Sequence, residues 1–200
     1  MRPKLKISQL TNLQDARSSA AVGFDLISFS LERGSSRKLS VSMAWNMIQW
    51  LSGPAITLEL NRASLEEWEE AKKSFSAEWI TLPWQDWEDS LTEGVNVILR
   101  VDAKQDSKEL ERIITSSSDQ EVFLELQLNS SEEVTTWQDL LDRTFLHFPD
   151  LDQAQAYVEG GHPLPYGFSF HQEAEEEPGV LDYERIDDFL EVFNEMFEED

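Results

Sequence analysis

Cysteine is missing from this 200-residue chain. Its absence excludes disulfide bonds, cysteine-based zinc sites and a thiol nucleophile. Basic residues are also scarce, because 16 Lys and Arg stand against 40 Asp and Glu, a formal net charge of -24. A field of this sign repels polyanions. We therefore expect neither nucleic acid nor an anionic membrane surface as a partner.

Long apolar runs and a glycine-rich turn are lacking too. No apolar run approaches the ~20 residues that span a membrane, and residues 1–10 are basic but have no apolar signal-peptide core. We therefore expect a soluble, cytoplasmic protein. A doubly wound nucleotide-binding sheet needs a glycine-rich phosphate turn after its first strand, and Ser8-Gln9-Leu10 is not one.

What the chain does contain is a regular alternation of strand-like and helix-like segments. Eight short apolar runs rich in β-formers lie at 5–8, 25–31, 55–60, 78–82, 96–101, 122–128, 144–148 and 166–170. Helical spacing follows each of them, at 13–22, 42–51, 64–75, 84–91, 107–117, 136–143, 151–160 and 182–199. Alternating strands and helices build parallel sheets, and eight units of about 25 residues close into a (βα)8 TIM barrel. We predict one such α/β barrel domain over residues 1–200.

Two local features refine this prediction. The first helix has Thr11 or Asn12 as its N-cap and Asp15 in its first turn. In the second helix, Trp45 and Trp50 share a helical spacing with other apolar residues. That spacing predicts that both tryptophans pack the helix onto the barrel.

Four segments of the chain, KISQLTNLQDA, GFDLISFSLERGSSRKLS, TLELNRASLEE and the part from Pro165 to Phe189, carry motifs. These motifs resemble those of the phosphoribosylanthranilate isomerase family of tryptophan biosynthesis. KISQLTNLQDA, from Lys6 to Ala16, resembles its first strand and turn, K-[IV]-C-G-[IL]-[TK]-x-x-x-D-A. GFDLISFSLERGSSRKLS resembles its second strand and loop, and TLELNRASLEE its third strand, with Asn61 matching. The last part of the chain follows P-x-G-[VI]-D-V and then E-x-x-P-G-x-K-D-x-x-x-[IV]-x-x-F. Its matching residues are Pro165, Gly167, Glu175, Pro178, Gly179, Asp182, Ile186 and Phe189.

The resemblance implies an Amadori rearrangement of a phosphoribosylated aminobenzoate, in which an acid protonates the furanose ring oxygen and a base deprotonates the adjacent carbon. Ser8 then stands at the position of the family's base, a Cys, and Arg37 at that of the Arg that pairs with the substrate carboxylate. The family's sixth strand ends in its acid, where this chain has Glu125-Leu126-Gln127. Strand alternation puts Glu125 and Gln127 on one face, and Glu125 is a candidate acid if burial raises its pKa.

The departures from the family's motifs fall on the chemistry. A serine hydroxyl is not ionised near neutral pH as a cysteine thiol can be. The family's glycine-rich phosphate loop is replaced by Asn129-Ser130-Ser131-Glu132, and the last two loops carry His147, Pro149-Asp150 and His171. Proline donates no N–H, and carboxylates repel a phosphate. We expect the phosphate site to be closed.

We interpret the chain as a pseudoenzyme, an isomerase-like barrel that has lost the rearrangement and binds an unknown small molecule or protein partner. The candidate binding residues are Arg37, Gln127, His147 and His171. Two alternatives stay open: an active isomerase with an atypical site that uses Glu125 and Arg37, and a different enzyme on the same barrel.

Several further expectations complete this interpretation. Glu59 and Arg100 lie late in their strands, where they either line a new pocket or, as we expect, join a polar network at the top of the barrel. We expect no cofactor. We also expect no metal, because His147 and His171 have no defined third ligand. Both a monomer and a homodimer are compatible with the sequence.

Overall fold

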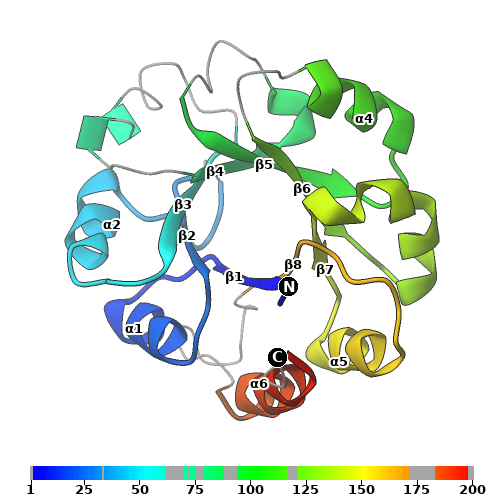
Figure 1. Cartoon of the computed structure of the whole chain (residues 1–200). Coiled ribbons are helices and arrows are strands. Elements are labelled where there is room, and N and C mark those ends of the chain that lie inside the picture. The colour runs from blue at the N-terminus through cyan, green and yellow to red at the C-terminus, as the bar shows by residue number, and fades with distance from the viewer. Residues whose placement is uncertain are drawn as a thin grey trace.

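Eight parallel strands close a barrel in chain order (Figure 1). The computed structural model describes residues 2–32, 34–61, 70–71, 73–74, 79–87, 94–116, 121–171 and 183–197. Each strand pairs with the next, and β8 pairs with β1, which confirms the predicted (βα)8 barrel. The strands are β1 (Lys4–Ser8), β2 (Leu26–Ser30), β3 (Ala55–Glu59), β4 (Trp79–Pro83), β5 (Asn96–Asp102), β6 (Val122–Gln127), β7 (Thr144–His147) and β8 (Gly167–His171). Every predicted strand boundary lies within one residue of these bounds.

Helices surround the barrel (Figure 1). The described α-helices are α1 (Leu13–Ala21), α2 (Val41–Ile48), α4 (Ser107–Ser116), α5 (Leu151–Glu159) and α6 (Tyr183–Phe197), and the 3-10 helices are η1 (Trp84–Asp86) and η3 (Ser131–Arg143). Most of the predicted helix 64–75 lies outside the described residues. No helix in the described part of the chain is both long and apolar enough to cross a membrane.

The segment predicted to be a helix at 136–143 belongs to η3, a 13-residue 3-10 helix. Three consecutive β-branched residues, Val134, Thr135 and Thr136, occupy its centre. β-Branched side chains lower α-helix propensity because they crowd the preceding turn. The periodic apolar pattern therefore predicted a helical segment here but not its 3-10 geometry.

Polar side chains cap the amino ends of three α-helices. Asn12 is the N-cap of α1, and its Oδ1 accepts a 2.8 Å hydrogen bond from the Asp15 backbone N–H, which decides between the two predicted caps. Ser40 and Asp150 cap α2 and α5 in the same way. Each cap satisfies an N–H group that has no partner within its helix.

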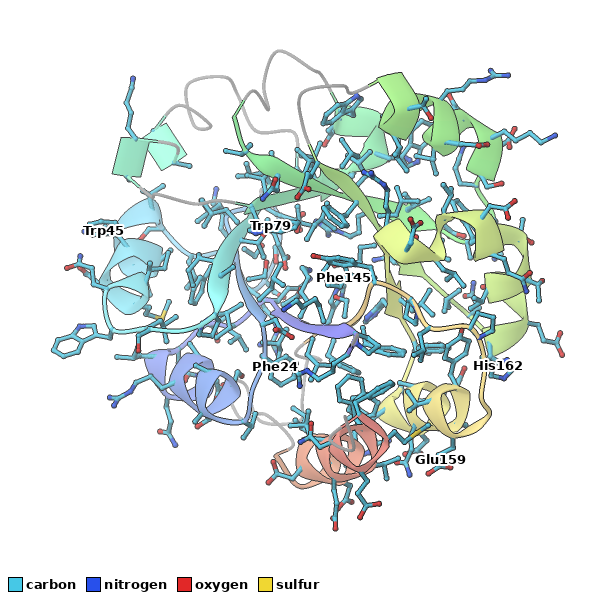
Figure 2. The ribbon with its side chains drawn as sticks, viewed as in Figure 1. Phe24, Trp45, Trp79, Phe145, Glu159 and His162 are labelled. Carbon is cyan, nitrogen blue, oxygen red and sulfur yellow. The ribbon has the colours of Figure 1, made fainter. Side chains whose placement is uncertain are left out.

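The prediction that Trp45 and Trp50 pack α2 onto the barrel is wrong. Trp50 is 70% exposed and Trp45 is 41% exposed, and Figure 2 shows Trp45 on the outer side of α2. Ala44 and Met47 are the buried residues of this helix. They lie three residues apart and form the narrow face that a short helix presents to the strands. Trp50 follows the end of the helix, where its backbone N–H donates a 3.0 Å hydrogen bond to the Met47 carbonyl while its side chain is exposed.

Aromatic and aliphatic side chains fill the barrel near the amino ends of the strands. Leu26, Trp79, Ile98, Phe123 and Phe145 form one buried cluster there, and Figure 2 shows Trp79 and Phe145 inside the ring of strands. Gly167 lets the chains approach closely at this level, since a Cβ on it would lie 2.5 Å from the Lys4 carbonyl oxygen. This apolar layer closes the amino end, so the other end of the barrel interior is the one available for polar chemistry.

Candidate functional site at the carboxyl ends of the strands

Polar side chains occupy the barrel interior beyond the apolar layer. Strand β1 shows the pattern: Leu5 and Ile7 belong to the core between strands and helices, whereas Lys6 and Ser8 alternate with them and face inward. The same alternation in the other strands gives a set of buried polar residues, namely Lys6, Ser8, Ser28, Ser30, Thr57, Glu59, Thr81, Glu125 and Ser169. The strand periodicity thus concentrates polar groups at the end where barrels of this type carry their sites.

An ion pair between Lys6 and Glu125 lies at the centre of this set. Both side chains are 0% exposed, and the Lys6 ammonium contacts Glu125 Oε2 closely. Lys6 Nζ also donates a 2.6 Å hydrogen bond to Ser8 Oγ. Glu125 receives two more hydrogen bonds, from Ser169 Oγ at 3.0 Å and from His171 Nε2 at 3.0 Å. Three donors therefore surround one buried carboxylate.

These donors decide the protonation state of Glu125. Burial alone raises the pKa of a carboxyl group, but the Lys6 ammonium, the hydrogen bond from His171 and the charge of Arg100 together hold the pKa of Glu125 well below its usual range. Glu125 is therefore a carboxylate near neutral pH and accepts hydrogen bonds only. The raised pKa that a Glu125 acid requires is not what this environment produces.

His147 and His171 stack on one another above the ion pair. Their ring centroids are 3.9 Å apart, with 22° between the planes. His147 Nδ1 donates to the Ser169 backbone carbonyl at 2.9 Å, which fixes its tautomer because a carbonyl oxygen can only accept. Burial and the neighbouring His171 lower the pKa of His147 to about 4. The ring is therefore neutral near pH 7 and carries a lone pair on Nε2.

A second ion pair crosses the mouth of the barrel. Arg100 of β5 contacts Glu32, which lies in the loop after β2, through both terminal nitrogens of its guanidinium group. Three carboxylates near Arg100, those of Glu59, Glu32 and Glu125, raise its pKa despite burial. Glu59 is 1% exposed, and neither of its carboxylate oxygens has a hydrogen-bond partner among the described residues.

The other predicted site residues border this network. Gln127 is the half-buried last residue of β6, paired in register with His147 of β7. Arg37 is half-buried in the loop after β2, where its backbone N–H donates to Ser35 Oγ at 3.1 Å. The structure thus joins Ser8, Glu125 and His171 in one network, which extends to His147 through the stacked rings. Glu175, which matches the family's motif, lies outside the described residues.

The start of α5 follows β7, and barrels of this type commonly bind phosphate in the loops after strands 7 and 8. Asp150 caps this helix: its Oδ1 accepts a 2.8 Å hydrogen bond from the Gln153 backbone N–H. A helix N-terminus binds phosphate through such free N–H groups. Here a carboxylate of the chain itself already holds one of them. Among the described residues, no group of three or more His, Asp or Glu side chains is arranged to hold a metal ion.

Sequence reasoning missed Lys6 and Glu32. The position of Lys6 could have indicated that it belongs to the site, because Lys6 and Ser8 lie two residues apart on the same face of a predicted strand and share its environment. A lysine in a strand is far more often solvated than buried, so this signal is weak by itself. Nothing in the sequence indicated Glu32, because only the tertiary structure brings the loop after β2 to Arg100, 68 residues further along the chain.

Gln9, at the mouth of the barrel, has a backbone conformation that is typical of glycine. Gln9 follows the last residue of β1 and has a φ angle of 64°, the only positive value among the described residues other than glycine. The resemblance puts Gln9 at a glycine of the first strand and turn. A side chain is strained in this left-handed region. Gln9 therefore occupies a backbone conformation that glycine adopts more readily.

The sequence and the fold were compared with those of known proteins. No model of a protein family matches the sequence, and no curated protein matches it. Solved structures do match the fold. Phosphoribosylanthranilate isomerase from Thermus thermophilus is 16% identical, with a TM-score of 0.77 over 96% of this chain and 99% of that one. The enzyme from Thermotoga maritima is 19% identical, with a TM-score of 0.73 over the same shares.

A different barrel enzyme is less similar. Type I 3-dehydroquinate dehydratase from Clostridium difficile is 9% identical, with a TM-score of 0.59 over 98% of this chain and 94% of that one. The barrel architecture is thus shared with another enzyme class, while the superposition on the isomerases is better. The chain has the fold of the phosphoribosylanthranilate isomerases, and the resemblance read from the sequence motifs is confirmed at the level of the fold.

Proposed function

We propose that this chain is a divergent member of the phosphoribosylanthranilate isomerase family whose barrel has lost the Amadori rearrangement and binds a small ligand at its mouth. The observation that carries the proposal is the Lys6–Glu125 ion pair, with both side chains fully buried. The rearrangement needs a proton donor at the ring oxygen. Glu125, the candidate acid, is held as a carboxylate by Lys6, Ser169 and His171.

The position of the base supports the same conclusion. Ser8 is fully buried, and its hydroxyl oxygen accepts a hydrogen bond from the Lys6 ammonium. The Lys6 ammonium is both the neighbouring cation and the hydrogen-bond donor, and it is not a base that could take the serine proton. Loss of one acid or base group typically costs ~10²–10⁴ in rate. Loss of both would leave little of the chemical step.

Phosphate binding is opposed as well. Asp150 holds an N–H group of α5 with its own carboxylate, and Pro149 beside it has no N–H to offer. The formal net charge of -24 adds a long-range field that disfavours a dianionic substrate. Polar groups nevertheless fill the mouth in a defined arrangement, which suits a binding site for a different molecule.

The alternative function is an active isomerase with an atypical site. One observation favours it: His171 is only partly buried, with 17% of its side chain exposed, and is hydrogen-bonded to Glu125. Such a pair can transfer protons to a ligand in the mouth. Arg37, in the neighbouring loop after β2, would then pair with the substrate carboxylate.

An activity measurement separates the two functions. Purified protein is incubated with phosphoribosylanthranilate and the ketose product is quantified by chromatography, alongside complementation of a tryptophan auxotroph that lacks the isomerase. We expect no turnover above the uncatalysed rate and no growth. Turnover that falls at least tenfold in both H171N and R37A, with Tm values unchanged, would establish the alternative and overturn the proposal.

A further inference from the structure

Glu59 is a buried carboxylate of this site whose oxygens accept no hydrogen bond from the described residues, although the charge of Arg100 lies near it. The buried carboxylates at this end of the barrel include those of Glu32, Glu59 and Glu125. Arg100 pairs with Glu32, and Lys6 pairs with Glu125. Both oxygens of Glu59 lack hydrogen-bond partners, although the residue is 1% exposed. A buried carboxylate without a compensating donor is strongly unfavourable.

The direction of Glu59 follows from its strand. Leu58 and Leu60 on either side belong to the core between strands and helices, so Glu59 points into the barrel. It is the last residue of β3 and pairs in register with Ser30 of β2 and Thr81 of β4. Glu32 follows Ser30 by two residues. The Glu32–Arg100 pair therefore lies on the mouth side of Glu59.

Two more buried oxygen atoms near this strand lack hydrogen-bond partners. They are Ser28 Oγ, on β2, and Asn61 Oδ1, two residues beyond Glu59. Together with the carboxylate they offer acceptors from two adjacent strands. An alkylammonium group carries three N–H donors and one positive charge. It would therefore supply the hydrogen bonds that the oxygens of Glu59 do not receive from the described residues.

We infer that the barrel mouth binds a small organic cation, a molecule with a primary alkylammonium group whose nitrogen is held by Glu59. This inference rests on the proposed binding function and gives its ligand a chemical class. An anion is disfavoured because Arg100 is already paired and three carboxylates would repel it. The net charge of -24 steers cations toward the protein. The ligand enters when the Glu32–Arg100 contact, whose side chains are 7% and 15% exposed, opens.

A structural rival exists, because the buried Arg100 Nε also lacks a hydrogen-bond partner. If Glu59 served only to pair with Arg100, replacing it would remove a useful contact and lower stability. If Glu59 is a ligand-binding carboxylate, its replacement by the neutral glutamine removes a buried charge that receives no hydrogen bond from the described residues. Residues of binding sites commonly lower the stability of the protein without its ligand, because they are placed for binding.

The test uses the full chain and 1,4-diaminobutane as the probe, with 1,4-butanediol as its neutral counterpart and magnesium chloride as an inorganic cation. Binding is measured by calorimetry in 0.15 M salt, where non-specific attraction to an acidic surface is screened. Wild-type protein and the variants Glu59→Gln and Glu195→Gln are compared. Glu195 is an exposed carboxylate on α6 and serves as the matched control.

We expect the diamine to bind and the diol not to bind, a loss of affinity of at least tenfold in Glu59→Gln, and unchanged affinity in Glu195→Gln. The ligand-free Glu59→Gln variant should melt at the wild-type temperature or up to about 4 °C higher. Equal affinity in Glu59→Gln, binding of magnesium but not of the diamine, or a lower Tm of ligand-free Glu59→Gln would each overturn the inference. Turnover of phosphoribosylanthranilate would instead refute the proposed loss of activity, so the two failures are distinguishable.

Discussion

Replacing Glu125 by glutamine should destabilise the protein strongly, because it leaves the Lys6 ammonium buried without its counter-charge. Both side chains are 0% exposed, so water cannot compensate. Breaking a buried ion pair by removing one partner costs about 3–5 kcal/mol. At about 2–4 °C per kcal/mol for a chain of this size, the Tm should fall by roughly 6–20 °C.

Urea denaturation followed by circular dichroism measures the free energy of unfolding of this variant. The control is Asp152→Asn, which breaks the exposed ion pair with Arg185 by the same chemical change and should alter stability by less than about 0.5 kcal/mol. The double variant Lys6→Met with Glu125→Gln should recover most of the loss, because no unpaired charge remains. A cost below about 1 kcal/mol for Glu125→Gln would show that Lys6 is solvated or displaced, and the reasoning on the site would be wrong.

Two further predictions concern a titrating group and a helix cap. The pKa of His147 is lowered to about 4 from 6.5, so the unfolded chain binds more protons between these values, and stability should fall by up to about 3 kcal/mol as the pH drops from 6.5 to 4. His147→Asn should flatten the pH dependence of unfolding in that window, and an unchanged slope would contradict the assignment. Asn12→Ala should cost about 1 kcal/mol in urea denaturation because it removes the N-cap of α1. Thr11→Ala should stay within about 0.5 kcal/mol, and equal costs would mean that the cap is misassigned.

Much of the fold could be predicted because the information was local. The alternation of strand-forming and helix-forming segments gave the barrel, and its eight strand boundaries hold to within one residue. Asn12 was one of two possible caps, and the hydrogen bond to the Asp15 N–H selected it. The predictions that were wrong depended on contacts between elements. Trp45 and Trp50 matched a helical period, but which side of a short helix faces the barrel depends on neighbouring elements.

The site was predictable in part. Ser8, Glu125, His147 and His171 were named from strand ends and from the family resemblance, and the structure places them in one connected region. Their protonation states could not be predicted from the sequence. The pKa of Glu125 falls instead of rising because Lys6, 119 residues away in the chain, donates to it.

The sequence by itself determined the order of strands and helices, the inward alternation of polar residues and the acidic character of the chain, because each depends on neighbouring residues or on composition. Only the tertiary structure decided which charges meet. Closing the barrel brings β1 beside β8 and places Lys6 against Glu125, and it carries the loop after β2 to Arg100. That same closure buries Glu59 with no hydrogen-bond partner among the described residues. Hydrogen bonds and ion pairs act over a few ångströms, so they depend on distances in space that the order of residues does not contain.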